Sequence, residues 1–134
     1  MKAIASLVVA VAAVAALLSA CAPAAGRPTV QYRAKAPELL AAIADIGVHM
    51  QPSTSYNYYS VQQISDHSVR LRAETVTGIS LVFGRHVTVV TFSASQDGDV
   101  ATLAASSNDE LGNHTIDTIL TKLDARYQRV VPAF

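Results

Sequence analysis

Histidine is the first residue type to consider for metal chemistry in this 134-residue chain, which contains His49, His67, His86 and His114. No two of them stand four residues apart, the spacing that places two zinc ligands on one face of a helix. A zinc or copper site needs three or four converging ligands, so only a meeting of His49 with His86 across a sheet would begin to form one. We expect no metal and no other cofactor.

Residues suited to nucleophilic catalysis are present without an arrangement that supports it. No serine lies in the G-x-S-x-G turn that exposes a nucleophile. Asp66-His67-Ser68 holds three triad residue types in succession, but neighbours in a tight turn cannot adopt the triad geometry. The acidic pair Asp97/Asp99 falls in a turn segment, which is typical of solvated carboxylates. We therefore predict that the protein is not an enzyme.

The single cysteine, Cys21, stands at the end of a secretory-type N-terminus. Lys2 supplies a positive charge, and residues 3–17 form an apolar run that only Ser6 interrupts. As a helix, this run would span about 22 Å, less than the roughly 30 Å hydrocarbon core of a bilayer. Charge, length and the small residues that follow are typical of a signal peptide. The run leads into Leu18-Ser19-Ala20-Cys21.

Leu18-Ser19-Ala20-Cys21 resembles the lipobox of bacterial lipoproteins. The resemblance implies that Cys21 receives a diacylglyceryl thioether, that cleavage follows Ala20, and that the new amino group is acylated, for example with palmitate. Two or three acyl chains, at about 0.8 kcal/mol per buried methylene, hold a small domain on a membrane. Ala22 stands where an Asp would signal inner-membrane retention, which favours the outer membrane where the host has one.

Composition divides the chain into three parts. Residues 1–20, of which 17 are apolar, are predicted to be the signal peptide. Residues 21–29, rich in Ala and Pro, form a flexible tether, and residues 30–134 form a single domain. Ten basic residues balance ten acidic ones, so we expect no nucleic-acid partner.

Hydrophobic periodicity predicts the elements of the domain. The strands are expected at residues 30–35, 55–65, 69–77, 86–95 and 100–106, with residues 79–83 a short strand or connector. A helix is expected at residues 36–46. A second is expected after an N-cap at Asn113 or Thr115, with an apolar stripe made of Ile116, Ile119, Leu120, Leu123 and Tyr127.

This order, β-α-β-β-β-β-α, predicts an α+β fold: a curled antiparallel sheet of about five strands with two helices packed on one face. In element order it resembles the helix-grip domains of some envelope lipoproteins. The resemblance implies a fold and transfers no function.

Tyr56, Tyr58 and Tyr59 form the only aromatic cluster and are a possible binding surface. On a strand, Tyr56 and Tyr58 would share one face and Tyr59 would take the other. Such tyrosines either stack on sugars or anchor a partner, or they cover a half-buried strand. We expect at least one of them in the core.

These features predict a lipid-anchored protein of the bacterial cell envelope with a structural or adaptor role. Its partners would be the membrane, through acylated Cys21, and an envelope protein. The alternative is a binding module for a small amphiphile or a glycan. The sequence identifies no particular partner or ligand.

Overall fold

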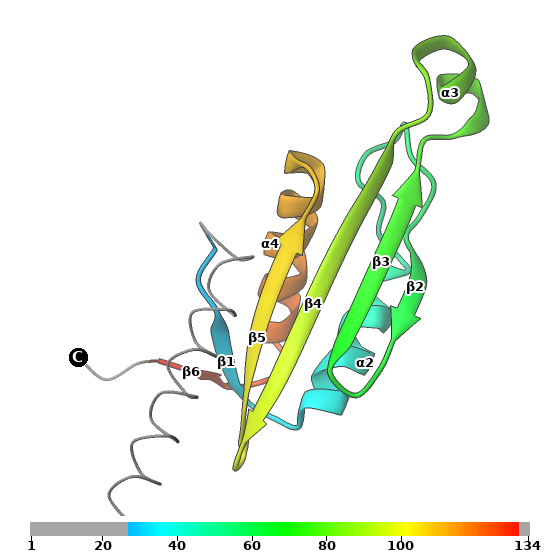
Figure 1. The fold of residues 1–134 in the computed structure, drawn as a ribbon. Helices are drawn as coiled ribbons and strands as arrows, with labels where there is room; N and C mark the ends of the chain where they lie inside the picture. The colour runs from blue at the N-terminus through cyan, green and yellow to red at the C-terminus, as the bar shows by residue number, and fades with distance from the viewer. Residues whose placement is uncertain (1–26, 132–134) are drawn as a thin grey trace, which may run out of the picture.

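Alternating apolar and polar residues build an antiparallel sheet in the computed structural model, which describes residues 27–131. Its strands are β1 (Val30–Arg33), β2 (Ser60–Ile64), β3 (Ser68–Glu74), β4 (Val87–Asp97), β5 (Val100–Ser107) and β6 (Arg129–Val130). Their order across the sheet is β2-β3-β4-β5-β1-β6 (Figure 1). The α+β class is confirmed, although the described residues form six strands and three helices instead of about five and two.

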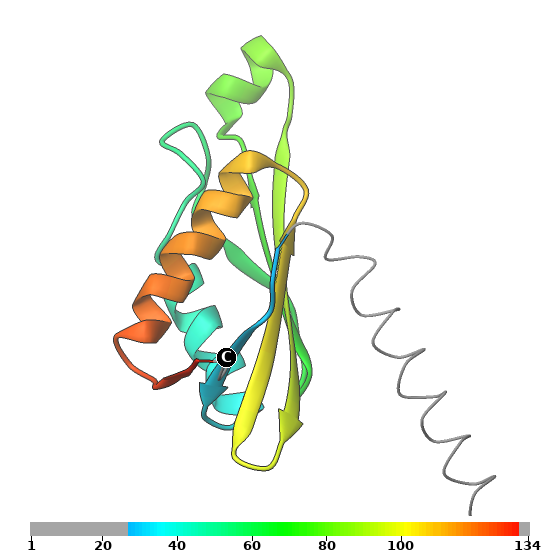
Figure 2. The same cartoon turned by 90° about the vertical axis from the view of Figure 1, so that its left-hand side faces the viewer.

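One face of the sheet carries the core. The inward side chains of β3 and β4, among them Leu71, Val90 and Phe92, are fully buried, as the alternation predicts. The helices α2 (Ala36–Gly47) and α4 (Glu110–Asp124) cover this face side by side (Figure 2). The two-helix layer on one face of the sheet therefore agrees with the prediction.

Helix α2 forms where the sequence predicts it. Pro37 fits the first turn, where its missing N–H costs nothing. The N–H of Ala36 donates to Oε1 of Gln96 at 2.6 Å, so a side chain from β4 fixes the start of the helix. Leu39 and Ile43 are buried against the sheet. The helix ends at Gly47, one residue later than predicted.

Helix α4 begins earlier than predicted, and its N-cap is Asp109. The carboxylate of Asp109 accepts a hydrogen bond from the N–H of Gly112 at 2.8 Å. The prediction of Asn113 or Thr115 as the cap is wrong, because both lie inside the helix. The buried stripe is also narrower than predicted: Ile116, Ile119 and Leu123 are fully buried, whereas Leu120 and Tyr127 are only partly buried.

Residues 79–83 belong to a helix, α3 (Thr77–Phe83), so the prediction of a strand or connector is wrong. The segment extends beyond the paired ends of β3 and β4, where no neighbouring strand accepts its backbone hydrogen bonds (Figure 1). A helical turn satisfies them internally, with the N–H of Ser80 donating to the carbonyl of Val76 at 2.9 Å.

Two further strand predictions need correction. The predicted strand at residues 55–65 is regular only as β2, and Tyr56 pairs with Thr75 through an isolated bridge. The two-residue strand β6, which pairs with β1, was not predicted. The hairpin between β4 and β5 is confirmed, and Gly98 adopts the positive φ of +61° that its two-residue turn requires.

Candidate functional site

The tyrosine cluster is split between the core and the surface. Tyr56 and Tyr59 are buried, whereas Tyr58 is 60% exposed. The expectation that Tyr56 and Tyr58 share a face is therefore wrong, because this segment is an irregular loop instead of a strand. The expectation that at least one tyrosine lies in the core is confirmed. Of the three, only Tyr58 offers its ring to a partner.

The two buried tyrosines are held by specific contacts. The hydroxyl groups of Tyr59 and Thr115 lie 2.8 Å apart, which ties the loop to α4. Burial raises the pKa of Tyr59 above its usual value, and the hydrogen bond to Thr115 offsets this only in part. The ring of Tyr56 packs edge-on against His86, with centroids 6.0 Å apart. These contacts give both tyrosines a structural role.

His86 and His49 do not come together. Nε2 of His86 lies 2.9 Å from Oδ2 of Asp109, at the start of α4. His49 contacts the carbonyl of Asp45 at the end of α2 and lines a hollow beside Lys122, near the end of α4. The 15 residues of α4, about 22 Å, separate the two histidines. Within residues 27–131, no three His, Cys, Asp or Glu side chains group together as metal ligands do.

Asp109 is the centre of a polar cluster at the cap of α4. Partial burial would raise its pKa, but hydrogen bonds from Gly112, His86 and Thr88 outweigh burial and hold the pKa below its usual value. The hydroxyl of Thr88, a fully buried residue, donates to Asp109 at 2.7 Å. The carboxylate is thus occupied on each side by structural donors, which leaves no free base for catalysis.

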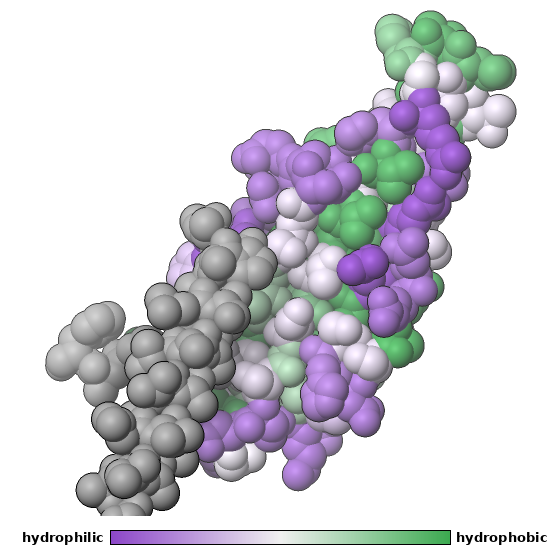
Figure 3. Space-filling view, viewed as in Figure 1, coloured by the Kyte–Doolittle hydropathy of each residue, from purple (hydrophilic) through white to green (hydrophobic). Residues whose placement is uncertain are grey.

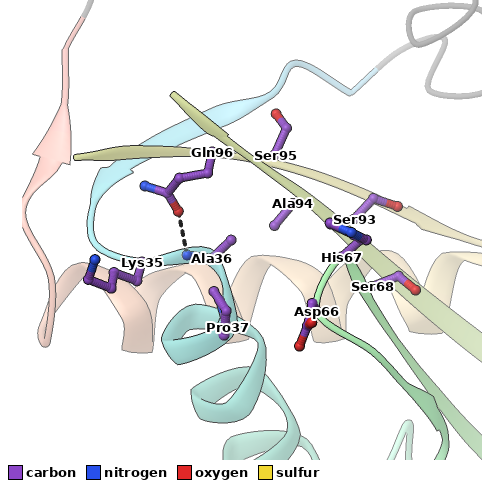
Figure 4. Close-up of a pocket in the computed structure, with 10 residues that line it drawn as sticks. All are labelled: Lys35, Ala36, Pro37, Asp66, His67, Ser68, Ser93, Ala94, Ser95 and Gln96. Carbon is purple, nitrogen blue, oxygen red and sulfur yellow. Dashed lines mark hydrogen bonds between the residues drawn. The ribbon is translucent and has the colours of Figure 1, made fainter. Parts of the chain in front are cut away.

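A hollow of about 810 Å³ lies between the start of α2 and the turn that joins β2 to β3 (Figure 4). Asp66, His67 and Ser68 line it, and they stand in the turn that the sequence predicts. The hydroxyl of Ser65 accepts from the N–H groups of His67 and Ser68 and so holds the turn together. No Tyr, Phe or Trp lines the hollow to stack on a sugar, and Gln96 at its rim is committed to α2.

The most unusual surface is the tip of the molecule, formed by α3 beyond the β3–β4 hairpin. Its side chains Leu81, Val82 and Phe83 are 82%, 72% and 82% exposed. No residue of α3 is buried. Figure 3 shows this apolar cap as a green cluster at the end of the molecule, next to a largely polar body.

The sequence analysis did not identify α3 as a functional segment. The signal was present, because residues 75–84 contain no charged side chain between Glu74 and Arg85. Read as a buried strand, the same run would have been ordinary core. Its exposure became visible only with the fold.

Strand β2 is the second exposed apolar feature. It forms one edge of the sheet, and all five of its residues are exposed. Val61 and Ile64 are 37% and 54% exposed. An edge strand presents unpaired backbone N–H and C=O groups to a further strand.

No protein-family model matches this chain, and searches of curated proteins and of solved structures also found no match. Among the described helices, none has the length and apolar character needed to cross a membrane. The predicted signal peptide and the predicted lipid-attachment residue Cys21 lie outside the described residues.

Proposed function

We propose that this protein is a lipid-anchored component of the bacterial cell envelope with an adaptor role and no enzymatic activity. The observation that carries the anchoring is the single cysteine of the chain at the last position of Leu18-Ser19-Ala20-Cys21. Ala22 favours the outer membrane, in hosts that have one. The domain that follows would be held at the membrane by the acyl chains on Cys21.

Metabolic labelling with an acyl probe tests the anchor. Wild-type protein should incorporate the probe and sediment with membranes. Cys21→Ser should remain as an unlabelled precursor, because the oxygen of serine does not replace the thiolate as the alkylated group. Equal labelling of the two proteins would overturn the lipoprotein proposal.

The adaptor role is supported by where the domain exposes apolar and backbone groups. In the described residues every buried polar side-chain atom has a hydrogen-bond partner, as expected of a structural core. The exposed groups instead gather at β2 and α3. A partner that adds a strand to β2 would satisfy the free edge and cover Val61 and Ile64.

Site-specific photo-crosslinking in native membranes tests the adaptor role. A photoreactive residue at Ile64 should yield a discrete crosslinked protein. The control position is Thr121, which is exposed on α4 away from the edge. A crosslinking pattern at Ile64 no different from that at Thr121 would remove the support for a partner at β2.

The alternative, a module for a small amphiphile or a glycan, has less support. Two of the three tyrosines that suggested it are buried, and the hollow in Figure 4 has no aromatic side chain to stack on a sugar. Titration of the mature protein with soluble cell-wall glycan fragments, followed by NMR, would test it directly. Shifts confined to the residues around Ser93 and His67 would revive this alternative.

A further inference from the structure

We propose that α3 is a second membrane contact, which inserts its apolar side chains into the headgroup–acyl boundary of the same bilayer that holds Cys21. The inference rests on the proposed anchoring and extends it from attachment to orientation. It assigns to Leu81, Val82 and Phe83 a lipid partner.

The distribution of side chains around α3 favours lipid over a protein groove. Leu81, Val82 and Phe83 are consecutive, so at about 100° per residue they point in three directions around the helix. A helix that docks in a groove uses a single stripe with i, i+3, i+4 spacing. A helix that is apolar on several sides needs an apolar medium on several sides. The acyl region of a bilayer supplies one.

The polar groups of the segment turn away from this tip. The hydroxyl of Ser80 lies 2.7 Å from that of Thr75 and also donates to the Thr75 carbonyl at 3.2 Å. Ser80 is therefore tied to the end of the hairpin and does not hydrate the tip. The helix also carries no charge that insertion would have to desolvate.

The residues below the tip are of the kinds found at a membrane interface. Arg85, which is largely exposed, pairs with Glu74 directly below α3. The hydrogen bond from Arg72, together with the charges of Arg72 and Arg85, keeps the pKa of Glu74 low. Exposed Tyr58 follows Asn57, whose N–H donates to the carbonyl of Glu74. Arginine and tyrosine both favour the headgroup level.

The strand directions place the lipid anchor and α3 at the same end of the molecule. β1 and β4 are both antiparallel to β5, so both run away from the α3 end. The chain therefore enters β1 from that end (Figure 1). Val30 pairs with Leu103, which pairs with Ala94, seven residues along β4 from Val87. This offset corresponds to about 23 Å.

The chain before β1 is long enough to bridge that offset. Cys21 precedes Val30 by nine residues, which span up to about 30 Å when extended. The acyl chains and the tip of α3 can therefore reach one membrane plane together. With both in place, the hairpin would stand on the membrane, and the β2 edge would be held at a fixed height above it.

Tryptophan fluorescence tests the insertion, because the chain contains no tryptophan of its own. The experiment uses acylated mature Phe83→Trp in vesicles of phosphatidylethanolamine and phosphatidylglycerol, with and without brominated acyl chains. The emission of the new tryptophan should shift to the blue. Brominated lipid should quench it about twofold, as expected for an element roughly 5–10 Å deep.

Two further variants serve as controls. Ile64→Trp places the same reporter on β2, away from the tip, and should show neither the shift nor the quenching. Adding Leu81→Asp and Val82→Asp to Phe83→Trp should abolish both signals while the protein still sediments with vesicles. Circular dichroism confirms that the variants are folded.

The outcomes separate this inference from the proposed anchoring. Unquenched emission at a water-like wavelength, in protein whose Cys21 is acylated, would overturn the insertion of α3 and leave the anchor intact. A blue shift without quenching would place the tip against protein, such as a second copy, and would also overturn it. If mass spectrometry finds no acyl chain on Cys21, the anchoring fails, and quenching of unacylated protein added to vesicles still decides the role of α3.

Discussion

At the scale of single residues, neighbouring tyrosines with the same chemistry have opposite environments. Tyr59→Ala should lower the free energy of unfolding by about 3–5 kcal/mol, because it empties a buried site and leaves Thr115 without its partner. Tyr58→Ala should change it by less than about 0.5 kcal/mol, because that ring is exposed. Urea denaturation of the two variants measures both values. Equal losses would contradict the placement of the loop.

Tyr32 makes a prediction about alkaline stability. Its hydroxyl donates to Oδ1 of Asp124 at 2.8 Å, and Arg129 lies against both residues. Burial, together with the hydrogen bond to Asp124, raises the pKa of Tyr32 from 10.0 to about 12. The folded protein therefore holds this proton more tightly than the unfolded chain. Stability from Tyr32 is complete below pH 10 and is lost as the pH rises to about 12, by about 2 kcal/mol.

Tyr32→Phe provides the matched comparison. It should cost about 1 kcal/mol at pH 7, because the hydrogen bond is lost while Asp124 keeps Arg129. Between pH 10 and 12, its unfolding free energy should fall less steeply than that of the wild type. Tyr59 titrates in both proteins, so the difference isolates Tyr32. Parallel pH profiles would show that the Tyr32 proton is not stabilised by folding.

At the scale of elements, the start of α4 depends on one side chain. Asp109→Ala should lower the free energy of unfolding by about 2–3 kcal/mol. It removes the N-cap, worth about 1 kcal/mol or more, and leaves the buried hydroxyl of Thr88 without its acceptor. Thermal or denaturant unfolding measures the loss.

Asn113→Ala is the control, because the sequence also suggested Asn113 as the cap. Asn113 lies inside α4, and its side chain only contacts Glu110 at the surface. Its replacement should change stability by no more than about 0.5 kcal/mol. A larger loss for Asn113→Ala than for Asp109→Ala would move the start of the helix to the position that the sequence suggested.

The elements differ in how far the sequence predicts them, and the reason is physical. β3 and β4 alternate cleanly because one face packs under the helices, so their inward residues could be predicted. Residues 79–83 are too few to show whether their period is that of a helix or a strand, and their exposure depends on a hairpin that outruns its neighbours. The cap of α4 was missed because Asp109 finds its other partners on β4, far away in sequence.

At the scale of the whole molecule, the parts that give stability are separate from the parts proposed to make contacts. The fully buried side chains belong to the sheet and to α2 and α4, whereas α3 buries none. The tyrosine surface suggested from the sequence proved to be largely core, and the exposed apolar surface lies in a segment read as strand. A sequence pattern reports which residues are apolar, but only the packing of elements decides which of them remain outside.

This separation predicts that the tip can be removed without unfolding the domain. Thr75 and His86 pair across the hairpin, so Asn-Gly can replace the ten residues between them, 76–85, as a two-residue turn. The free energy of unfolding should stay within about 1 kcal/mol of the wild-type value, because only a few exposed contacts are lost. The denaturant m-value should not fall noticeably, since α3 buries little surface that unfolding would expose. Ile116→Ala, which truncates a fully buried side chain of α4, should by contrast cost about 2–5 kcal/mol in the same assay. A loss from the excision as large as that from Ile116→Ala would mean that α3 packs against the domain in solution, and its role as a free membrane contact would fail with it.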